Sequence, residues 1–146
     1  MYSNSYANSL EAEVMSASPV RLVHLLYRGA LDSVRAARTE LRAGDIPARS
    51  RAITKAQAII NELASSLNCE QGGEFARNLQ GLYSWLLERL TAANLQQREQ
   101  PLIEAEQVLQ TLESAWREIS SESEYGSATA IVASAGHAYQ FAGCVA

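Results

Sequence analysis

The chain has 146 residues, of which 47% are hydrophobic and 19% charged, a balance that suits one globular domain with an apolar core. Its formal net charge of −4 argues against nucleic acid as the main partner, and two cysteines are too few for a disulfide framework. The sequence has no signal-peptide pattern and no stretch of about 20 apolar residues. We therefore expect a soluble, cytosolic domain that does not insert into membranes.

Two helices are predicted in the first half of the chain. Ser18 and Pro19 mark a helix start, because serine can cap the first turn and proline loses no hydrogen bond there. Apolar residues then recur at steps of three or four up to Leu41, and Gly44 fits the left-handed position after a helix end. After a restart at Asp45, a second stripe follows with strict helical spacing, made of Ile53, Ala56, Ile60, Leu63 and Leu67.

Two more helices are predicted in the second half. The third covers roughly residues 74–97, with a stripe formed by Phe75, Leu79, Leu82, Leu86 and Ala93. The fourth opens at Pro101 and carries Leu102, Ala105, Leu109, Leu112, Trp116 and Ile119. Four long helices with short connections predict an all-α fold, an antiparallel up-down-up-down four-helix bundle. We assign the bundle to residues 18–119, a short helical N-terminal cap segment to residues 1–17, and a C-terminal tail of unknown role to residues 120–146.

The sequence lacks the motifs of common catalytic and metal sites. Neither His24 nor His137 belongs to a Glu-x-x-His pair, and the cysteines form no C-x-x-C motif. His137 and Cys144 have no orienting third group, and Gly72-Gly73 lacks the lysine and hydroxyl residue of a phosphate loop. We therefore predict no enzyme, no catalytic residue, no metal and no cofactor.

Arginines recur every seven residues on the first helix, at Arg21, Arg28, Arg35 and Arg42. Because a helix drifts only about 20° over seven residues, they form one stripe. The stripe fits either a solvated face paired with nearby acids such as Asp32 or a docking strip for an acidic partner.

Apolar residues also lie beside the predicted core stripes. Tyr27 and Leu31 flank the first stripe, and Tyr83, Trp85 and Leu87 flank the third. This extra apolar surface fits either boundary packing or a groove that accepts an additional helix or extended peptide.

A set of motifs follows in order over about residues 6–119. It consists of Tyr6, Ser18-Pro19, Leu26-Tyr27-x-Gly29-Ala30, Gly44-Asp45, Lys55-Ala56, Ile59-Ile60-x-Glu62-Leu63, Leu67, Gly72-Gly73-Glu74-x-Ala76-x-Asn78-Leu79, Leu82-Tyr83, Arg89-Leu90, Ala93-Asn94 and Trp116. This ordered set resembles the FliS family of flagellin export chaperones. The sequence departs from the family pattern at Arg28, where an acidic residue is expected, and in the long tail.

The resemblance implies a four-helix bundle in the bacterial cytosol that is not an enzyme. Its implied client is the disordered C-terminal segment of flagellin, which it keeps from polymerising and helps deliver to the flagellar type III export machinery. Components of that machinery are a second expected class of partner, and the chain itself is expected to be a monomer or weak homodimer. The alternative is a homo-oligomeric bundle whose apolar flanks bury against copies of itself.

We expect the client to lie along the second and third helices. The residues expected to contact it are Tyr6, Leu10, Tyr27, Leu31, Ile53, Ala56, Ile60, Leu63, Leu67, Tyr83 and Leu87, although Ile53, Ala56, Ile60 and Leu63 also fit the core. The N-terminal cap segment, with Tyr6, Leu10 and Val14 four residues apart, is too short to be stable alone and is expected to cover part of this groove.

The tail from Ala128 to Ala146 is uncharged and contains Tyr139 and Phe141. Disordered tails are normally charged and poor in aromatic residues. Three alternatives stay open for it: a loose tail, a helix that folds back on the bundle, and an oligomer contact.

Overall fold

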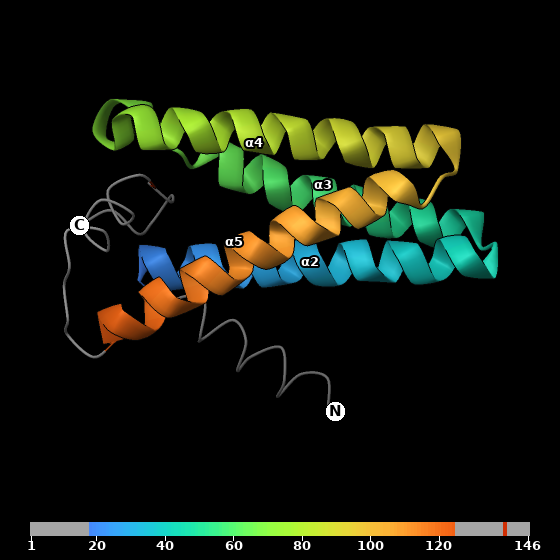
Figure 1. The fold of residues 1–146 in the computed structure, drawn as a ribbon, viewed down its shortest axis with the longest axis horizontal. Helices are drawn as coiled ribbons and strands as arrows, with labels where there is room; N and C mark the ends of the chain where they lie inside the picture. The colour runs from blue at the N-terminus through green and yellow to red at the C-terminus, as the bar shows by residue number, and fades with distance from the viewer. Residues whose placement is uncertain (1–17, 125–138, 140–146) are drawn as a thin grey trace, which may run out of the picture.

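The computed structural model describes residues 18–124 and residue 139. The described chain contains four helices, named α2 (Pro19–Ala43), α3 (Ile46–Ser65), α4 (Cys69–Gln96) and α5 (Gln100–Glu124) (Figure 1). Successive helices run in opposite directions, which confirms the predicted antiparallel four-helix bundle. The N-terminal cap segment, including Tyr6 and Leu10, and the tail apart from Tyr139 lie outside the described residues.

The helix ends form at the residues whose chemistry predicts them. The Ser18 hydroxyl accepts a hydrogen bond from the Arg21 backbone N–H at 3.2 Å, and an Asp45 carboxylate oxygen accepts one from Ala48 N–H at 3.0 Å. Gly44 has φ 75°, in the left-handed region that glycine adopts without strain, and ends α2. These caps confirm the first connection predicted from the sequence.

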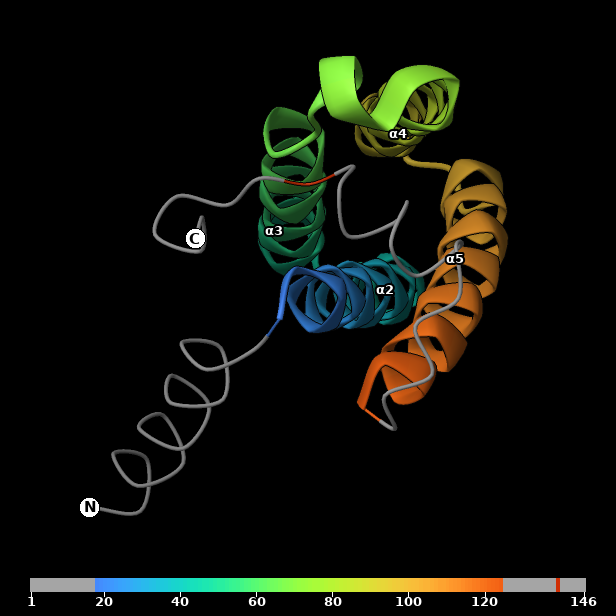
Figure 2. The same ribbon diagram turned by 90° about the vertical axis from the view of Figure 1, so that its left-hand side faces the viewer.

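The helices form a ring in the order α2, α3, α4, α5, as Figure 2 shows looking along the bundle. α2 packs more extensively against α3 and α5 than α4 does. At Gly29 a β-carbon would lie 3.3 Å from Ile59 Cδ1, so the absence of a side chain there lets α2 and α3 approach closely. α4 is therefore the least tightly held member of the ring.

The core side of α4 differs from the predicted stripe. The buried residues are Ala76, Leu79, Tyr83, Leu86, Leu90 and Ala93, which keep strict three-four spacing, whereas Phe75 is 44% exposed. The prediction was right for Leu79, Leu86 and Ala93. It was wrong for Phe75 and Leu82, because α4 carries apolar side chains on two neighbouring faces and these two residues lie on the outer one. Tyr83, placed on the boundary by the sequence, is fully buried.

The connection between α3 and α4 contains a break. Asn68 caps α4 by accepting hydrogen bonds from the Glu70 and Gln71 backbone N–H groups, at 3.2 and 3.1 Å. Gly73 then adopts φ 56° and ψ −135°, a conformation essentially restricted to glycine. One helical turn thus precedes the long part of α4, where the sequence predicted only a turn.

No helix in the part of the chain that the structure describes combines the length and apolar character that a membrane span requires.

Candidate binding surface

Nine of the eleven residues expected to contact a client are described. Seven of them are buried in the bundle: Tyr27, Leu31, Ile53, Ala56, Ile60, Leu63 and Tyr83. Leu67 and Leu87 are only partly buried and pack against the core from its edge. Most of the expected contact set therefore lies inside the free bundle, and a partner that leaves the core closed meets Leu67 and Leu87.

Three tyrosines and a tryptophan from distant parts of the chain meet at one end of the bundle. We call Tyr27 (α2), Tyr83 (α4), Trp116 (α5) and Tyr139 the aromatic cluster. The Tyr83 hydroxyl is hydrogen bonded to the hydroxyls of both Tyr27 and Tyr139. The Trp116 ring centroid lies 6.1 Å from that of Tyr27 and 5.5 Å from that of Tyr139, the latter edge-on at 78°. Such edge-to-face pairs are favourable beyond the area they bury.

Tyr139 belongs to the tail, yet it is part of the interior. Its side chain is 3% exposed, and its backbone pairs in antiparallel orientation with Leu67, in the connection between α3 and α4 (Figure 2). At this residue the tail is extended rather than helical and contacts the bundle. The sequence gives one signal for this contact, the aromatic residues of an uncharged tail, but nothing that identifies Tyr139 or its partners.

Burial keeps the phenols of the cluster neutral. It raises the pKa of Tyr27 to about 12, an effect that the hydrogen bonds from Tyr83 and Tyr139 reduce. Burial also raises the pKa of Tyr83, to which the phenols of Tyr27 and Tyr139 add. It raises the pKa of Tyr139 as well, where Tyr27 adds to the shift and the hydrogen bond with Tyr83 opposes it. The hydroxyls thus hold the cluster together by hydrogen bonds and present no phenolate.

A shallow apolar groove runs between α4 and α5. Its walls are Leu82 on α4 and Val108 and Leu112 on α5, with Gln107 and Thr111 at the rim, and it encloses about 260 Å³. The exposed Phe75 lies two turns before Leu82, on the same side of α4. This α4–α5 groove shares α4 with the predicted client path, but its second wall is α5 instead of α3.

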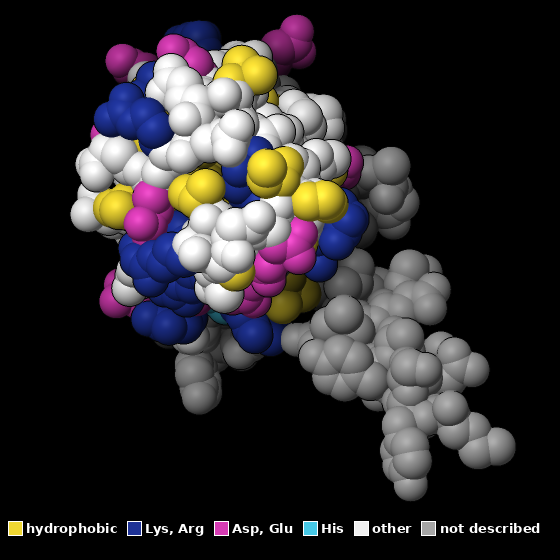
Figure 3. All heavy atoms as spheres, turned by 90° about the vertical axis from the view of Figure 1, so that its right-hand side faces the viewer, with side chains coloured by type: hydrophobic (Ala, Val, Ile, Leu, Met, Phe, Trp, Pro, Cys, Tyr) yellow, Lys and Arg dark blue, Asp and Glu magenta, His cyan; other side chains and the backbone are white. Residues whose placement is uncertain are grey.

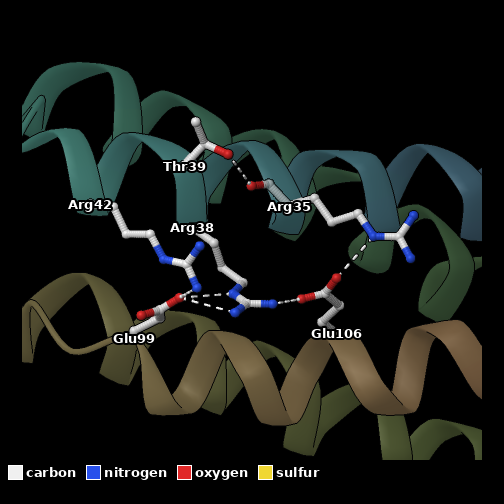
Figure 4. Close-up of polar contacts among 6 residues, drawn as sticks. All are labelled: Arg35, Arg38, Thr39, Arg42, Glu99 and Glu106. Carbon is white, nitrogen blue, oxygen red and sulfur yellow. Dashed lines mark hydrogen bonds and ion pairs between the residues drawn. The ribbon is translucent and has the colours of Figure 1, made fainter.

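The opposite side of α5 is bound to α2 by charged pairs (Figure 4). Arg35 Nε lies 2.9 Å from Glu106 Oε1, and Arg42 Nη2 lies 2.6 Å from Glu99 Oε1. The guanidinium of Arg38 forms ion pairs with both carboxylates. We call these five residues the arginine–glutamate clamp. Two arginines of the predicted stripe are thus paired with acids other than Asp32: Arg35 with Glu106 on α5, and Arg42 with Glu99 just before α5.

The clamp shifts the acidity of its carboxylates. Burial opposes ionisation of Glu106, but the hydrogen bonds from Arg35 and Arg38 outweigh it and hold the pKa below its ordinary value. The hydrogen bond from Arg42 is the main cause that lowers the pKa of Glu99. Both glutamates are therefore ionised at neutral pH.

A second polar pair joins the same helices further along. His24 Nε2 lies 3.0 Å from a carboxylate oxygen of Glu113, and both residues are buried. Within the described residues, no group of three histidine, cysteine, aspartate or glutamate side chains is placed to hold a metal ion. The pair links α2 to α5, and we assign it no chemistry.

A family model described as flagellar protein FliS matches residues 2–123 of this sequence. This chain belongs to the FliS family. The sequence-based resemblance is thereby confirmed, and so is the four-helix bundle that it implies.

Three relatives, each named a flagellar secretion chaperone, cover most of this FliS-family chain. The FliS of Salmonella typhimurium is 41% identical over 80% of this chain and 87% of its own length. The FliS of Vibrio cholerae is 32% identical over 78% of this chain and 84% of its own length. The FliSB of Pseudomonas aeruginosa is 38% identical over 77% of this chain and 89% of its own length. The family supports a role in flagellar export as a chaperone.

The family match also separates two parts of the aromatic cluster. Tyr27, Tyr83 and Trp116 lie within the matched residues 2–123, whereas Tyr139 lies beyond them. The tail contact is therefore a feature of this FliS chain outside the region that defines its family.

Proposed function

We propose that this FliS chain is a cytosolic chaperone that binds the C-terminal segment of newly made flagellin. It keeps that segment from polymerising prematurely and assists its delivery to the flagellar type III export machinery. It does so without catalysis. The observation that carries the proposal is the family match over residues 2–123.

The surface of the bundle supports binding of an amphipathic segment. The α4–α5 groove presents Leu82, Val108 and Leu112, and the exposed Phe75 extends the same side of α4. A client helix that lays its apolar face into such a groove recognises it through side chains spaced three, four and seven residues apart. Leu67 and Leu87 offer further partly exposed apolar surface.

The energetics favour a long surface over a small pocket. A disordered client must offset an ordering entropy of about 1–2 kcal/mol per residue. Coupled folding and binding typically buries on the order of 1,000–3,000 Å², which at about 25 cal/mol per Å² of apolar area supplies tens of kcal/mol gross. A bundle that keeps its core closed and still exposes apolar flanks over several turns can provide such an area.

Co-purification with flagellin tests the proposal. Tagged chaperone should retain full-length flagellin from the same bacterium and should lose flagellin that lacks its C-terminal segment. Retention of both, or of neither, contradicts the proposal.

A matched pair of variants on α5 tests the groove. Thr111 and Gln110 are adjacent and exposed; Thr111 lines the α4–α5 groove, whereas Gln110 lines a polar depression beside α2. Thr111→Arg should weaken flagellin binding about tenfold or more by filling an apolar groove with a charge, about 1.4 kcal/mol, and Gln110→Arg should leave it unchanged. Equal effects would remove the groove from the binding surface.

The same variants address the homo-oligomeric alternative. A groove that buries against a second copy would give a mass that rises with protein concentration in sedimentation and falls in Thr111→Arg. A chaperone should stay a monomer or weak dimer at the concentrations where it binds flagellin.

A further inference from the structure

The side chain of Tyr139 occupies a defined space in the end of the bundle. Its hydroxyl contacts that of Tyr83, its ring meets Trp116 at 5.5 Å, and its backbone pairs with Leu67. We call the space bounded by Tyr83, Trp116 and Leu67 the tyrosine slot.

These contacts are those by which a folded domain holds a bound peptide. Extended peptides add to an exposed backbone edge and place single side chains in pockets, and buried aromatic anchors dominate such interfaces. Leu67 provides the backbone edge, since it lies between the end of α3 and the start of α4. The slot provides the pocket, in which Tyr139 is 3% exposed.

The slot is suited to tyrosine rather than to any aromatic residue. The Tyr83 hydroxyl lies between two other phenol oxygens, those of Tyr27 and Tyr139, in a buried setting. Loss of one partner from a buried hydrogen-bonded pair is unfavourable, because the remaining hydroxyl has been removed from water. Phenylalanine would fill the apolar volume but leave this hydrogen bond unmade.

The slot is continuous with the surface proposed for the client. Trp116 follows Leu112 by four residues on α5, so the two side chains lie one turn apart on the same face, and the α5 wall of the groove leads into the slot. A client segment that lies along the groove toward this end reaches the residues that Tyr139 contacts.

We propose that the tyrosine slot is an exchangeable docking site, and that Tyr139 fills it as an intramolecular ligand that the flagellin segment must displace. The proposal rests on the proposed function for the identity of the competing client. It gives the tail, which lies beyond the family match, a role as a regulator of client affinity.

The size of the effect follows from the occupancy of the slot. When only a fraction of the molecules has a free site, the apparent dissociation constant rises by the inverse of that fraction. A slot that is free in about a tenth of the molecules weakens client binding about tenfold. A tethered ligand reaches this occupancy easily, because its effective concentration is on the order of millimolar.

The test uses the full-length chain with Tyr139→Ala and a fluorescent peptide of residues 132–146 in which Cys144 is replaced by serine. Fluorescence anisotropy should show that the Tyr139→Ala chain binds this peptide at least tenfold more tightly than the unsubstituted chain, whose slot is already filled. A peptide carrying Tyr139→Phe should bind several-fold more weakly, and one carrying Tyr139→Ala should not bind. Cooperative thermal unfolding of the Tyr139→Ala chain establishes that it is folded.

The second arm measures competition with the client. The Tyr139→Ala chain should bind the flagellin C-terminal segment about tenfold more tightly than the unsubstituted chain, and flagellin should release the bound peptide. Failure of the folded Tyr139→Ala chain to bind the peptide overturns the exchangeable slot. If both chains bind flagellin with the same affinity and flagellin does not release the peptide, flagellin and Tyr139 do not compete for the slot, and that part of the proposal is overturned. If flagellin binds neither chain, the proposed function fails, and the peptide arm still decides separately whether the slot exchanges its ligand.

Discussion

The two ends of the bundle are closed by different interactions. At the end that carries the α2–α3 and α4–α5 connections, the arginine–glutamate clamp ties α2 to α5 through charged groups at the surface (Figure 4). Figure 3 shows basic and acidic side chains interleaved over this end. At the other end, the aromatic cluster joins α2, α4 and α5 through buried rings and hydroxyls.

The two ends differ in which segments of the chain complete them. The clamp is made entirely of residues from α2, α5 and the turn before α5, so it forms whenever the bundle forms. The aromatic cluster depends in addition on Tyr139, which lies 15 positions after the last residue of α5. The proposed exchange of Tyr139 would therefore open this end without unfolding the helices.

The largest loss of stability is expected from substitution of Trp116, whose ring contacts those of both Tyr27 and Tyr139. Trp116→Ala should lower the free energy of unfolding by about 3–5 kcal/mol, because it leaves a large cavity in the aromatic end. Denaturant titration measures the loss. Trp85→Ala is the matched control, since Trp85 is only partly buried at the edge of the core, and it should cost clearly less. Equal losses would show that the aromatic end contributes no more to the free energy of unfolding than the partly buried flank of α4.

Alkaline pH should weaken the aromatic end and spare the clamp. Folding raises the pKa of Tyr27 to about 12, so the unfolded chain releases this proton first as the pH rises. The stabilisation is therefore complete below about pH 10 and is lost between about pH 10 and 12, at a cost on the order of 2–3 kcal/mol. Arg38 stays charged in this range, because the hydrogen bond to Glu106 raises the pKa of its guanidinium.

Thermal unfolding at several alkaline pH values measures this loss. The decline should be smaller in Tyr139→Phe, which has one phenol fewer to titrate. A melting temperature that stays constant across this range would contradict the assignment of neutral, buried phenols.

The clamp should give the smallest effect. Glu106→Gln removes the carboxylate shared by Arg35 and Arg38 and should lower stability by about 1 kcal/mol, less at high salt. Since folding lowers the pKa of Glu106, the stabilisation is present above its ordinary pKa and is lost as the pH falls below it. Urea titrations at low and high salt measure the loss, with the exposed Glu118→Gln on the same helix as control. A salt-independent loss would mean that packing, not charge, holds this end.

Local chemistry made most of the fold predictable. Ser18, Gly44 and Asp45 act at the helix ends as their side chains and conformations suggest, and strict spacing placed Ile53, Ile60 and Leu63 in the core. The error on α4 arose where two apolar faces lie side by side, because periodicity alone does not decide between Phe75 and Tyr83.

Contacts between distant residues were less predictable. The stripe of arginines was visible in the sequence, but its partners Glu99 and Glu106 depend on how α5 returns to α2. The contact of Tyr139 with Leu67 depends on one residue in a segment without helical or strand periodicity. Such contacts depend on how the helices pack against one another, which local sequence patterns do not specify.

The ring order of the helices has a consequence for how the chain folds during synthesis. Three of the four helix interfaces join neighbours in the chain, and the interface of α5 with α2 closes the ring, with His24 and Glu113 separated by 89 positions. Because distant contacts carry the larger loop-closure entropy, we expect the α2–α3 hairpin to form early and α5 to dock late. Until α5 has left the ribosome, the face of α2 that it covers stays open, so a nascent FliS chain itself passes through a stage with an unprotected apolar surface.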